Sequence, residues 1–181
     1  MSFEPIITYK RLAPKEIGPD LLQHFTRYQV TTEVWVKEND QYKTKADSFI
    51  DHWDDAKKQQ VIRDLQVCVQ AGGRVVAAIT EGRVIGFANV ESTRFGSQKE
   101  YVELPYIHVS NDFRKRGIGV QLFTRACEEA RQLQAKKLYI AAHPSVETQH
   151  FYRAVGCTYA AEVNQQIFER EPLDIQMEYV L

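Results

Sequence analysis

The stretch that decides the fold is residues 107–123, IHVSNDFRKRGIGVQLF. It begins as an apolar strand over residues 107–109, crosses a short polar turn, and continues from Gly117 as an amphipathic helix. Pro105, just before it, indicates a break in the strand. An equally apolar strand follows at residues 137–142. A strand, a helix and a second strand in this order predict a parallel crossover within a mixed α/β sheet.

The turn in the middle of this stretch has the composition of an anion site. Its six residues are Arg114, Lys115, Arg116, Gly117, Ile118 and Gly119. The first turn of a helix offers unpaired N–H groups and the positive end of the helix dipole, while glycines let an anionic ligand approach the backbone. These features favour a nucleotide-type pyrophosphate, although a solvated cationic turn at a helix start fits the six residues equally well.

Two common nucleotide motifs are absent from the sequence. Leu122 stands where a dinucleotide-binding GxGxxG would have its third glycine, and no GxxxxGK[ST] occurs. The pattern therefore argues against an NAD enzyme, a kinase and an NTPase.

The R-x-x-G-x-G of Arg114 to Gly119, after a strand that ends in Val109, resembles the acetyl-CoA-binding motif of the GNAT superfamily of N-acetyltransferases. A second motif, SVETQHFYRAVGC at residues 145–157, is similar to the family's N-x-x-A-x-x-F-Y-x-x-x-G-F. The positions that depart from it are Ser145, Thr148 and Cys157. The two motifs occur one helix and one strand apart, and the resemblance covers residues 73–160 best.

The resemblance implies a GNAT-like fold with the order β-α-α-β-β-β-α-β-α-β-β and a V-shaped opening between the two central parallel strands. It implies acetyl-CoA as cosubstrate and no metal. Backbone amides of the glycine-bearing turn would hold the pyrophosphate, and the preceding strand would pair with the peptide-like pantetheine arm. The residues implied to bind the cofactor are Ile107, His108, Val109, Arg114, Lys115, Arg116, Gly117, Ile118, Gly119, Ser145 and Tyr152.

The resemblance also implies direct acetyl transfer to a primary amine through a tetrahedral intermediate, without a covalent acyl-enzyme. A backbone N–H near Val109 would stabilise the oxyanion. Tyr152 matches the family's general acid, because a phenol stays protonated at neutral pH and can donate to the departing sulfur. Glu103 is the candidate base, acting directly or through water, with His108 and His143 as competitors.

Local patterns predict the remaining elements. Strands are expected at residues 6–12, 74–79, 84–90, 101–109, 157–163 and 175–181, and helices at residues 17–28, 54–70 and 145–155. Residues 29–48 have no clear period and are expected to form an exposed lid or loop. The walls of the acceptor pocket are expected from residues 28–50, with Trp35, and from the hairpin loop that contains Phe95.

Composition narrows the class of protein. The 181 residues carry a formal net charge of -1 and a sequence pI near 6.5, so no cationic surface for nucleic acid is expected. No signal-peptide pattern or apolar run of membrane length occurs. Cys68, Cys127 and Cys157 form neither a CxxC pair nor a zinc pattern and are expected to be small buried hydrophobes. We expect a single cytoplasmic domain over residues 1–181, with no nucleic-acid or membrane partner and a homodimer left open.

The sequence does not choose the acceptor, which is either a small-molecule amine or a peptide amine. An acyl donor longer than acetyl also fits the motifs. A catalytically silent acetyl-CoA-binding regulatory protein is the alternative from another functional class, and the presence of Tyr152 and Glu103 disfavours it.

Overall fold

The structure, a computed structural model, describes residues 4–181. Its strands are β1 (Thr8–Arg11), β2 (Tyr28–Glu38), β3 (Gln41–His52), β4 (Arg74–Thr80), β5 (Arg83–Val90), β6 (Tyr101–Glu103), β7 (Ile107–Val109), β8 (Lys137–Ala142), β9 (Thr158–Tyr159) and β10 (Ile175–Val180). Its helices are α1 (Asp55–Gln70), α2 (Ile118–Gln132), α3 (Val146–Ala154) and α4 (Gln165–Arg170), with single 3₁₀ turns η1 (Pro14–Glu16) and η2 (Asn111–Phe113).

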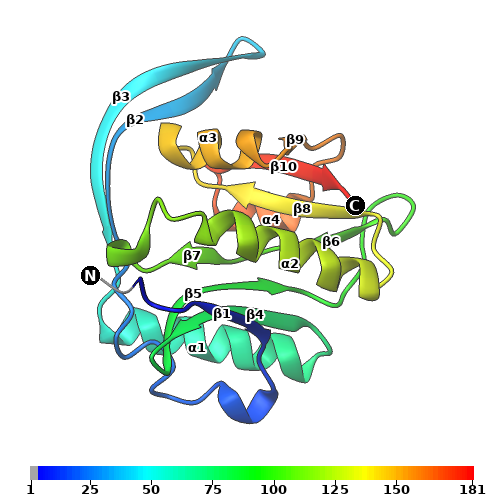
Figure 1. The fold of residues 1–181 in the computed structure, drawn as a ribbon. Helices are drawn as coiled ribbons and strands as arrows, with labels where there is room; N and C mark the ends of the chain where they lie inside the picture. The colour runs from blue at the N-terminus through cyan, green and yellow to red at the C-terminus, as the bar shows by residue number, and fades with distance from the viewer. Residues whose placement is uncertain (1–3) are drawn as a thin grey trace.

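The strands form two four-stranded sheets and a separate hairpin (Figure 1). The first sheet has the order β1-β4-β5-β7 and is antiparallel, and the second has the order β6-β8-β10-β9. Among the strands of residues 4–181, only β6 and β8 pair in parallel, and α2 connects the two sheets between β7 and β8. The predicted mixed class and the parallel crossover are therefore confirmed.

The chain changes sheets at Pro105, as the sequence indicates. The Leu104 N–H still donates to the Tyr139 carbonyl of β8 at 3.0 Å, whereas the Tyr106 N–H donates to Asn89 Oδ1, on β5, at 3.0 Å. Proline has no N–H to give to either ladder, so the break occurs where it costs least. Beyond this point β7 and β8 diverge, and this divergence is the V-shaped opening that the family resemblance implies.

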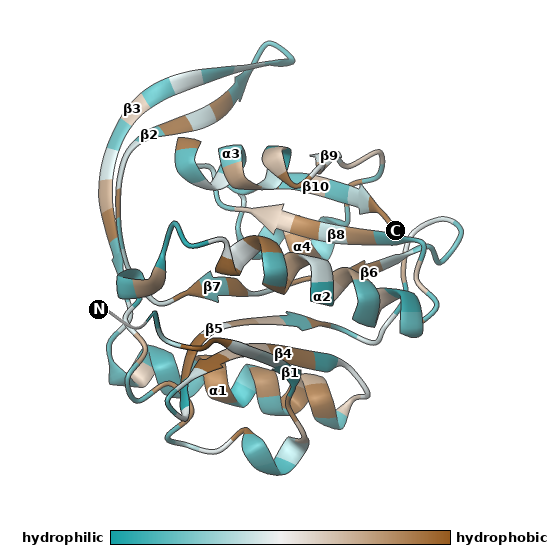
Figure 2. Cartoon of the chain, viewed as in Figure 1, coloured by the Kyte–Doolittle hydropathy of each residue, from teal (hydrophilic) through white to brown (hydrophobic). Residues whose placement is uncertain are grey.

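The core is divided between the two faces of the first sheet. On β4, Val76 and Ala78 pack in the cluster that contains α2, while Val75 and Ala77 pack in the cluster that contains α1. A strand buried on both faces explains the unbroken apolar run in this part of the sequence, visible as brown stretches in Figure 2. On β5, a Cβ at Gly86 would lie 2.9 Å from Leu122 Cδ1, so the glycine lets α2 approach the sheet closely.

The helix predicted over residues 17–28 is wrong. The structure has the 3₁₀ turn Pro14–Glu16 followed by irregular turns. Ile17 and Leu22 are buried as their spacing suggested, but they pack against α1 from an irregular segment. A side chain of α1 holds the backbone of this irregular segment, since Gln66 Nε2 donates to the Ile17 carbonyl at 2.8 Å. Separate turns, such as the one closed by the Leu21 N–H and the Gly18 carbonyl at 3.1 Å, therefore stand in place of a continuous helix.

The lid or loop predicted over residues 29–48 is also wrong, because β2 and β3 form a long hairpin that arches beside α3 (Figure 1). It turns at Asn39 and Asp40, whose φ angles of 50° and 61° match the left-handed turn that joins strands most compactly. Along β2 the polar side chains of Gln29 and Thr31 face inward and Val30 faces outward. This reversed polarity conceals the strand from a search for inward apolar residues.

The C-terminal part of the structure differs in detail from the elements predicted from the sequence. The strand expected over residues 157–163 is reduced to β9, and the unpredicted helix α4 follows, with Asn164 as its N-cap. The strand expected over residues 101–109 is two strands, β6 and β7. The elements predicted at β1, α1, β4, β5, α2, β8, α3 and β10 are present with shifted ends.

Candidate active site

The turn between β7 and α2 has the backbone of an anion site. Lys115 and Gly117 have φ angles of 60° and 76°, so left-handed residues alternate with right-handed or extended ones. Such alternation directs successive N–H groups into one concavity, and Gly117 is also the N-cap of α2. Arg114 folds back, with Nε 3.4 Å from the Val109 carbonyl, while Lys115, Arg116 and Gly117 are exposed. The predicted cationic turn is thus accessible to a phosphate-bearing ligand.

Glycine is needed at positions 117 and 119 of the turn for different structural reasons. Gly117 is required by its positive φ, and nothing lies within 4 Å of the position where its Cβ would be. A Cβ on Gly119 would lie 3.1 Å from Cε2 of Phe151, on α3. The second glycine therefore serves close packing between the two sequence motifs, beyond the ligand approach expected for it.

Strand β7 has one paired edge and one free edge. Its residues Ile107, His108 and Val109 pair with β5, and β7 ends its sheet. The other edge borders the opening and suits a peptide-like partner such as a pantetheine arm. The His108 ring packs on Trp53, with ring centroids 4.8 Å apart, on the α1 side. Burial, together with the charges of Arg27 and Arg114, holds the pKa of His108 well below its usual value, so this ring is neutral.

His143, which follows β8, has a polar neighbour at each ring nitrogen. Nδ1 accepts a hydrogen bond from the Ser145 N–H at 3.2 Å, which leaves the proton of the neutral ring on Nε2. Nε2 lies 3.3 Å from Asp51 Oδ2, on β3. Burial lowers the pKa of His143, and Asp51 opposes this effect. The geometry gives His143 a role in joining β8 to the hairpin and makes it a poor free base.

Tyr152 and Ser145 lie on α3 and at its N-cap. Tyr152 is buried in the cluster beneath α2, and burial raises the pKa of its phenol far above the ordinary value, so the proton is held at all physiological pH values. The Ser145 hydroxyl accepts hydrogen bonds from Gln29 Nε2 at 3.1 Å and from the Thr148 N–H at 3.2 Å. Ser145 therefore anchors the β2–β3 hairpin, a contact that the motif alone did not reveal.

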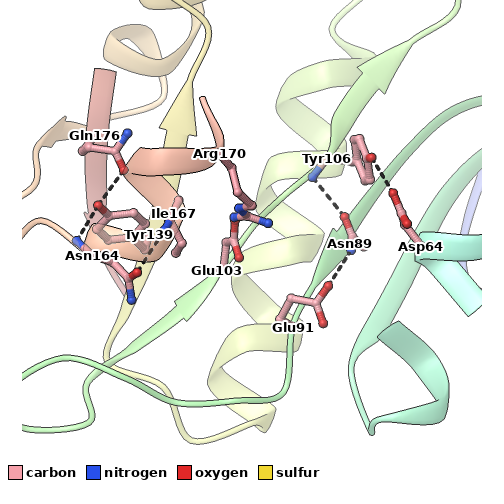
Figure 3. Close-up of polar contacts among 10 residues, drawn as sticks. All are labelled: Asp64, Asn89, Glu91, Glu103, Tyr106, Tyr139, Asn164, Ile167, Arg170 and Gln176. Atoms are coloured by element: carbon pink, nitrogen blue, oxygen red, sulfur yellow. Dashed lines mark hydrogen bonds and ion pairs between the residues drawn. The ribbon is translucent and has the colours of Figure 1, made fainter. Parts of the chain in front are cut away.

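Glu103 lies at the end of β6 and forms an ion pair with Arg170 of α4 (Figure 3). Burial raises the pKa of Glu103, and Arg170 opposes that effect. Neighbouring polar groups continue from this pair toward α1, where the Tyr106 hydroxyl donates to Asp64 Oδ2 at 2.8 Å. Arg170 was missed in the sequence because α4 itself was not predicted.

The two candidate catalytic residues come from opposite faces of the second sheet. Glu103 shares the face of Tyr101, which packs against Ile167 of α4. Tyr152 belongs to the cluster on the α2 face. This placement is suited to a reaction in which the donor and the acceptor reach the opening from different sides.

The aromatic residues expected in the acceptor walls are engaged in packing. The backbone N–H of Trp35 donates to the Pro144 carbonyl at 2.8 Å, and the Arg153 guanidinium lies 5.1 Å from the Trp35 ring centre. Phe95 stacks on Tyr101 in the cluster beside α4. Each ring therefore has a packing partner and remains half-buried.

The remaining chemistry-bearing groups do not suggest another kind of site. Cys68, Cys127 and Cys157 are free and buried, and burial raises their pKa values to about 12, 11 and 12. A thiolate nucleophile is therefore disfavoured. Residues 4–181 contain no group of three or more His, Cys, Asp or Glu side chains that could hold a metal ion. None of the helices in this range is long and apolar enough to cross a membrane.

Residues 32–157 match the acetyltransferase (GNAT) family. The chain belongs to the GNAT acetyltransferase family. The match includes the cationic turn and the motif of α3, so the family resemblance drawn from these residues is confirmed. No curated protein matches the chain.

Solved structures show the same fold at low sequence identity. A nourseothricin acetyltransferase has a TM-score of 0.70 at 16% identity, covering 96% of this chain and 98% of its own. A putative streptothricin acetyltransferase from Bacillus anthracis, in complex with acetyl coenzyme A, has a TM-score of 0.66 at 12% identity, covering 97% of each chain. A putative acetyltransferase from Salmonella typhimurium with its cofactor acetyl-CoA has a TM-score of 0.56 at 16% identity, covering 97% and 94%.

Proposed function

We propose that this GNAT protein transfers the acetyl group of acetyl-CoA directly to a primary amine, with residues 1–181 acting as one catalytic domain. The observation that carries the proposal is the combination of a free β7 edge with the cationic turn that follows it. A peptide-like arm ending in a pyrophosphate needs these two features in this order. The acetyl-CoA named in the Bacillus anthracis and Salmonella typhimurium structures supports the choice of cofactor.

Acetyl-CoA, when bound, supplies a thioester carbonyl that an amine can attack. The amides of the turn and of the first turn of α2 would bind its pyrophosphate, together with Arg114, Lys115 and Arg116. The β7 backbone near Val109 would donate a hydrogen bond to the thioester oxygen and stabilise the oxyanion that develops there.

Two proton transfers complete the proposed reaction. Tyr152 keeps its proton at neutral pH and would donate it, or a hydrogen bond, to the departing sulfur. Glu103 would accept a proton from the attacking ammonium, directly or through water. The His143 ring faces the Ser145 N–H and Asp51, and His108 packs among aromatic rings, so Glu103 is the proposed base although it too is paired, with Arg170.

The acceptor is proposed to be a small-molecule amine. The names of two of the similar structures refer to nourseothricin and streptothricin, and at 16% and 12% identity they support a small acceptor without choosing it.

Release of CoA thiol across a panel of primary amines tests the proposal. We expect turnover by the wild type, a loss of about 10²-fold or more in kcat for Tyr152→Phe and Glu103→Gln, and an unchanged Kd for acetyl-CoA in Glu103→Gln. Tight binding of acetyl-CoA with no turnover of any amine would instead support the regulatory alternative. Failure to bind acetyl-CoA would contradict both functions.

A further inference from the structure

Two residues connect the proposed base to the strand that is proposed to hold the thioester. Pro105 and Tyr106 lie between the end of β6, which carries Glu103, and the start of β7. The Glu103 carbonyl is fixed by the N–H of Glu91, which follows β5, at 2.9 Å. Pro105 has no N–H and cannot donate to either sheet. The position of β7 relative to Glu103 therefore depends on how Tyr106 is held.

Asn89 of β5 holds the Tyr106 peptide from both sides. The pairing of Ala88 with Ile107, continued by one residue, places Asn89 opposite Tyr106. The Asn89 N–H donates to the Tyr106 carbonyl at 3.1 Å, as in a regular antiparallel ladder. The Tyr106 N–H donates to Asn89 Oδ1 at 3.0 Å, in the place where a regular ladder would use the Asn89 carbonyl. The main chain of Asn89 thus makes one half of this pair, and its side chain makes the other.

The Asn89 side chain is held in one orientation by its two neighbours. It is 1% exposed, and its Nδ2 donates to Glu91 Oε1 at 3.4 Å, while Oδ1 faces the Tyr106 N–H (Figure 3). A carboxylate on one side and an N–H on the other require the amide nitrogen and the amide oxygen in this order. An apolar side chain of the same size would take this acceptor away from the Tyr106 N–H, which is costly at a buried position.

The contacts of Tyr106 divide between its ring and its peptide. The ring is tied to α1, since the Tyr106 hydroxyl donates to Asp64 Oδ2 at 2.8 Å. The two hydrogen bonds to Asn89 act on the peptide itself, at the point where the chain turns from one sheet to the other. A displacement of about 1 Å between reacting groups can cost about 10²-fold in rate. Small movements of this peptide therefore matter for a base on β6 and an oxyanion donor on β7.

We propose that Asn89 is a positioning residue for acetyl transfer, whose side chain fixes β7 relative to Glu103 without touching the substrate or the cofactor. An asparagine side chain can reach a peptide that is already turning away from the ladder, so Tyr106 stays hydrogen-bonded to β5 while the chain leaves toward β6. The inference rests on the proposed acetyl transfer, because it assigns Asn89 the task of aligning the two groups that this reaction requires.

Three variants test this inference. Asn89→Leu removes the acceptor of the Tyr106 N–H at similar volume. Asn89→Asp combined with Glu91→Gln exchanges the amide and the carboxylate between the two positions and keeps an oxygen for that N–H. Thr80→Val is the matched control, because it removes from β4 of the same sheet a hydroxyl that donates to the Ile6 carbonyl at 3.0 Å, on a residue that is 5% exposed.

The expected results separate positioning from stability. Asn89→Leu and Thr80→Val should each lower Tm by a few degrees. Asn89→Leu alone should also lower kcat, by about tenfold or more, with an unchanged Kd for acetyl-CoA because the cationic turn is intact. The exchange of amide and carboxylate should recover most of that kcat. If Asn89→Leu does not fold, Asn89→Asp alone replaces it: its two adjacent carboxylates should lower kcat, and the addition of Glu91→Gln should restore it.

A measurement on the free protein keeps the inference separate from the proposed function. Residual dipolar couplings of the backbone amides report the orientation of β6 relative to β7, and they can be measured even if no amine is turned over, which would defeat the proposed function alone. They should change in Asn89→Leu and return in the exchange variant. The inference is overturned by unchanged couplings in Asn89→Leu, by a loss of kcat in Thr80→Val equal to that in Asn89→Leu, or by a folded exchange variant that is as slow as Asn89→Leu.

Discussion

Arg170 of α4 and Glu103 of β6 form an ion pair, although 67 residues separate them in the chain. The Glu103 side chain is only 13% exposed, so the ionisation of its carboxyl depends strongly on the ion pair with Arg170. Burial raises the pKa of Glu103, and the positive charge of Arg170 lowers it. Arg170 is therefore placed to set the pH at which the proposed base becomes available.

Replacing Arg170 with methionine should move the acid limb of the kcat/KM profile to higher pH. The pKa of Glu103 rises when its cationic partner is lost, so a base that must be ionised works only at a higher pH. We expect a several-fold loss at pH 6 that is largely recovered above pH 8. Arg170→Lys is the control and should keep the wild-type profile. An unshifted limb in Arg170→Met would exclude Glu103 as the titrating base.

Gly117→Ala should weaken both folding and cofactor binding. Alanine at a φ of 76° costs about 1–2 kcal/mol, and relief of that strain would turn the amides of the turn away from the ligand. Gly82, in the turn between β4 and β5, is a matched control with a φ of 73° and the same open surroundings. Both variants should lose similar stability in urea unfolding, whereas only Gly117→Ala should raise the Kd for acetyl-CoA. Equal Kd values would argue against the turn as the pyrophosphate site.

Asp174, just before β10, should make the protein less stable as pH rises. Burial raises the pKa of this carboxyl to about 7, with smaller effects from Glu171 and Asp51. The unfolded chain loses this proton near its ordinary pKa, so the contribution of Asp174 to stability is fully present below pH 4 and is lost as pH rises toward 7. This group should remove about 2–4 kcal/mol from the free energy of unfolding over that interval.

Asp174→Asn should abolish that part of the pH dependence. Urea unfolding from pH 4 to pH 8 measures it as the difference between variant and wild type, which should grow with pH in favour of the variant. Asp47→Asn, at an exposed position of β3, is the control and should leave the slope unchanged. A constant difference between Asp174→Asn and wild type would contradict the prediction.

The sequence predicted those parts of the fold whose cause is local. The helices α1 and α3 have N-caps at Asp54 and Ser145, and α2 begins at a glycine after a buried strand. Pro105 marked the place where the chain leaves one ladder for another. The anion turn and the position of Tyr152 in α3 follow from the same short-range patterns.

The missed features depend on contacts across the fold. In β2 the inward residues Gln29 and Thr31 are polar, and Gln29 donates to Ser145, so apolar periodicity cannot reveal the strand. Helix α4 has a single buried residue, Ile167, and therefore almost no periodic pattern. The pairing of Glu103 with Arg170 could not be predicted without that helix.

The divergence at Pro105 has a consequence for how the protein exchanges its amide hydrogens. Each sheet closes its own ladder, and α2 packs against residues of both, so the two sheets can open as separate cooperative units that share one helix. A ligand that pairs with β7 along its free edge would supply a ladder of hydrogen bonds to an edge that pairs with no strand in residues 4–181. The protection of amide hydrogens from exchange would then increase first along Ile107 to Val109. The bound cofactor would stabilise the native state as an additional strand of the sheet does.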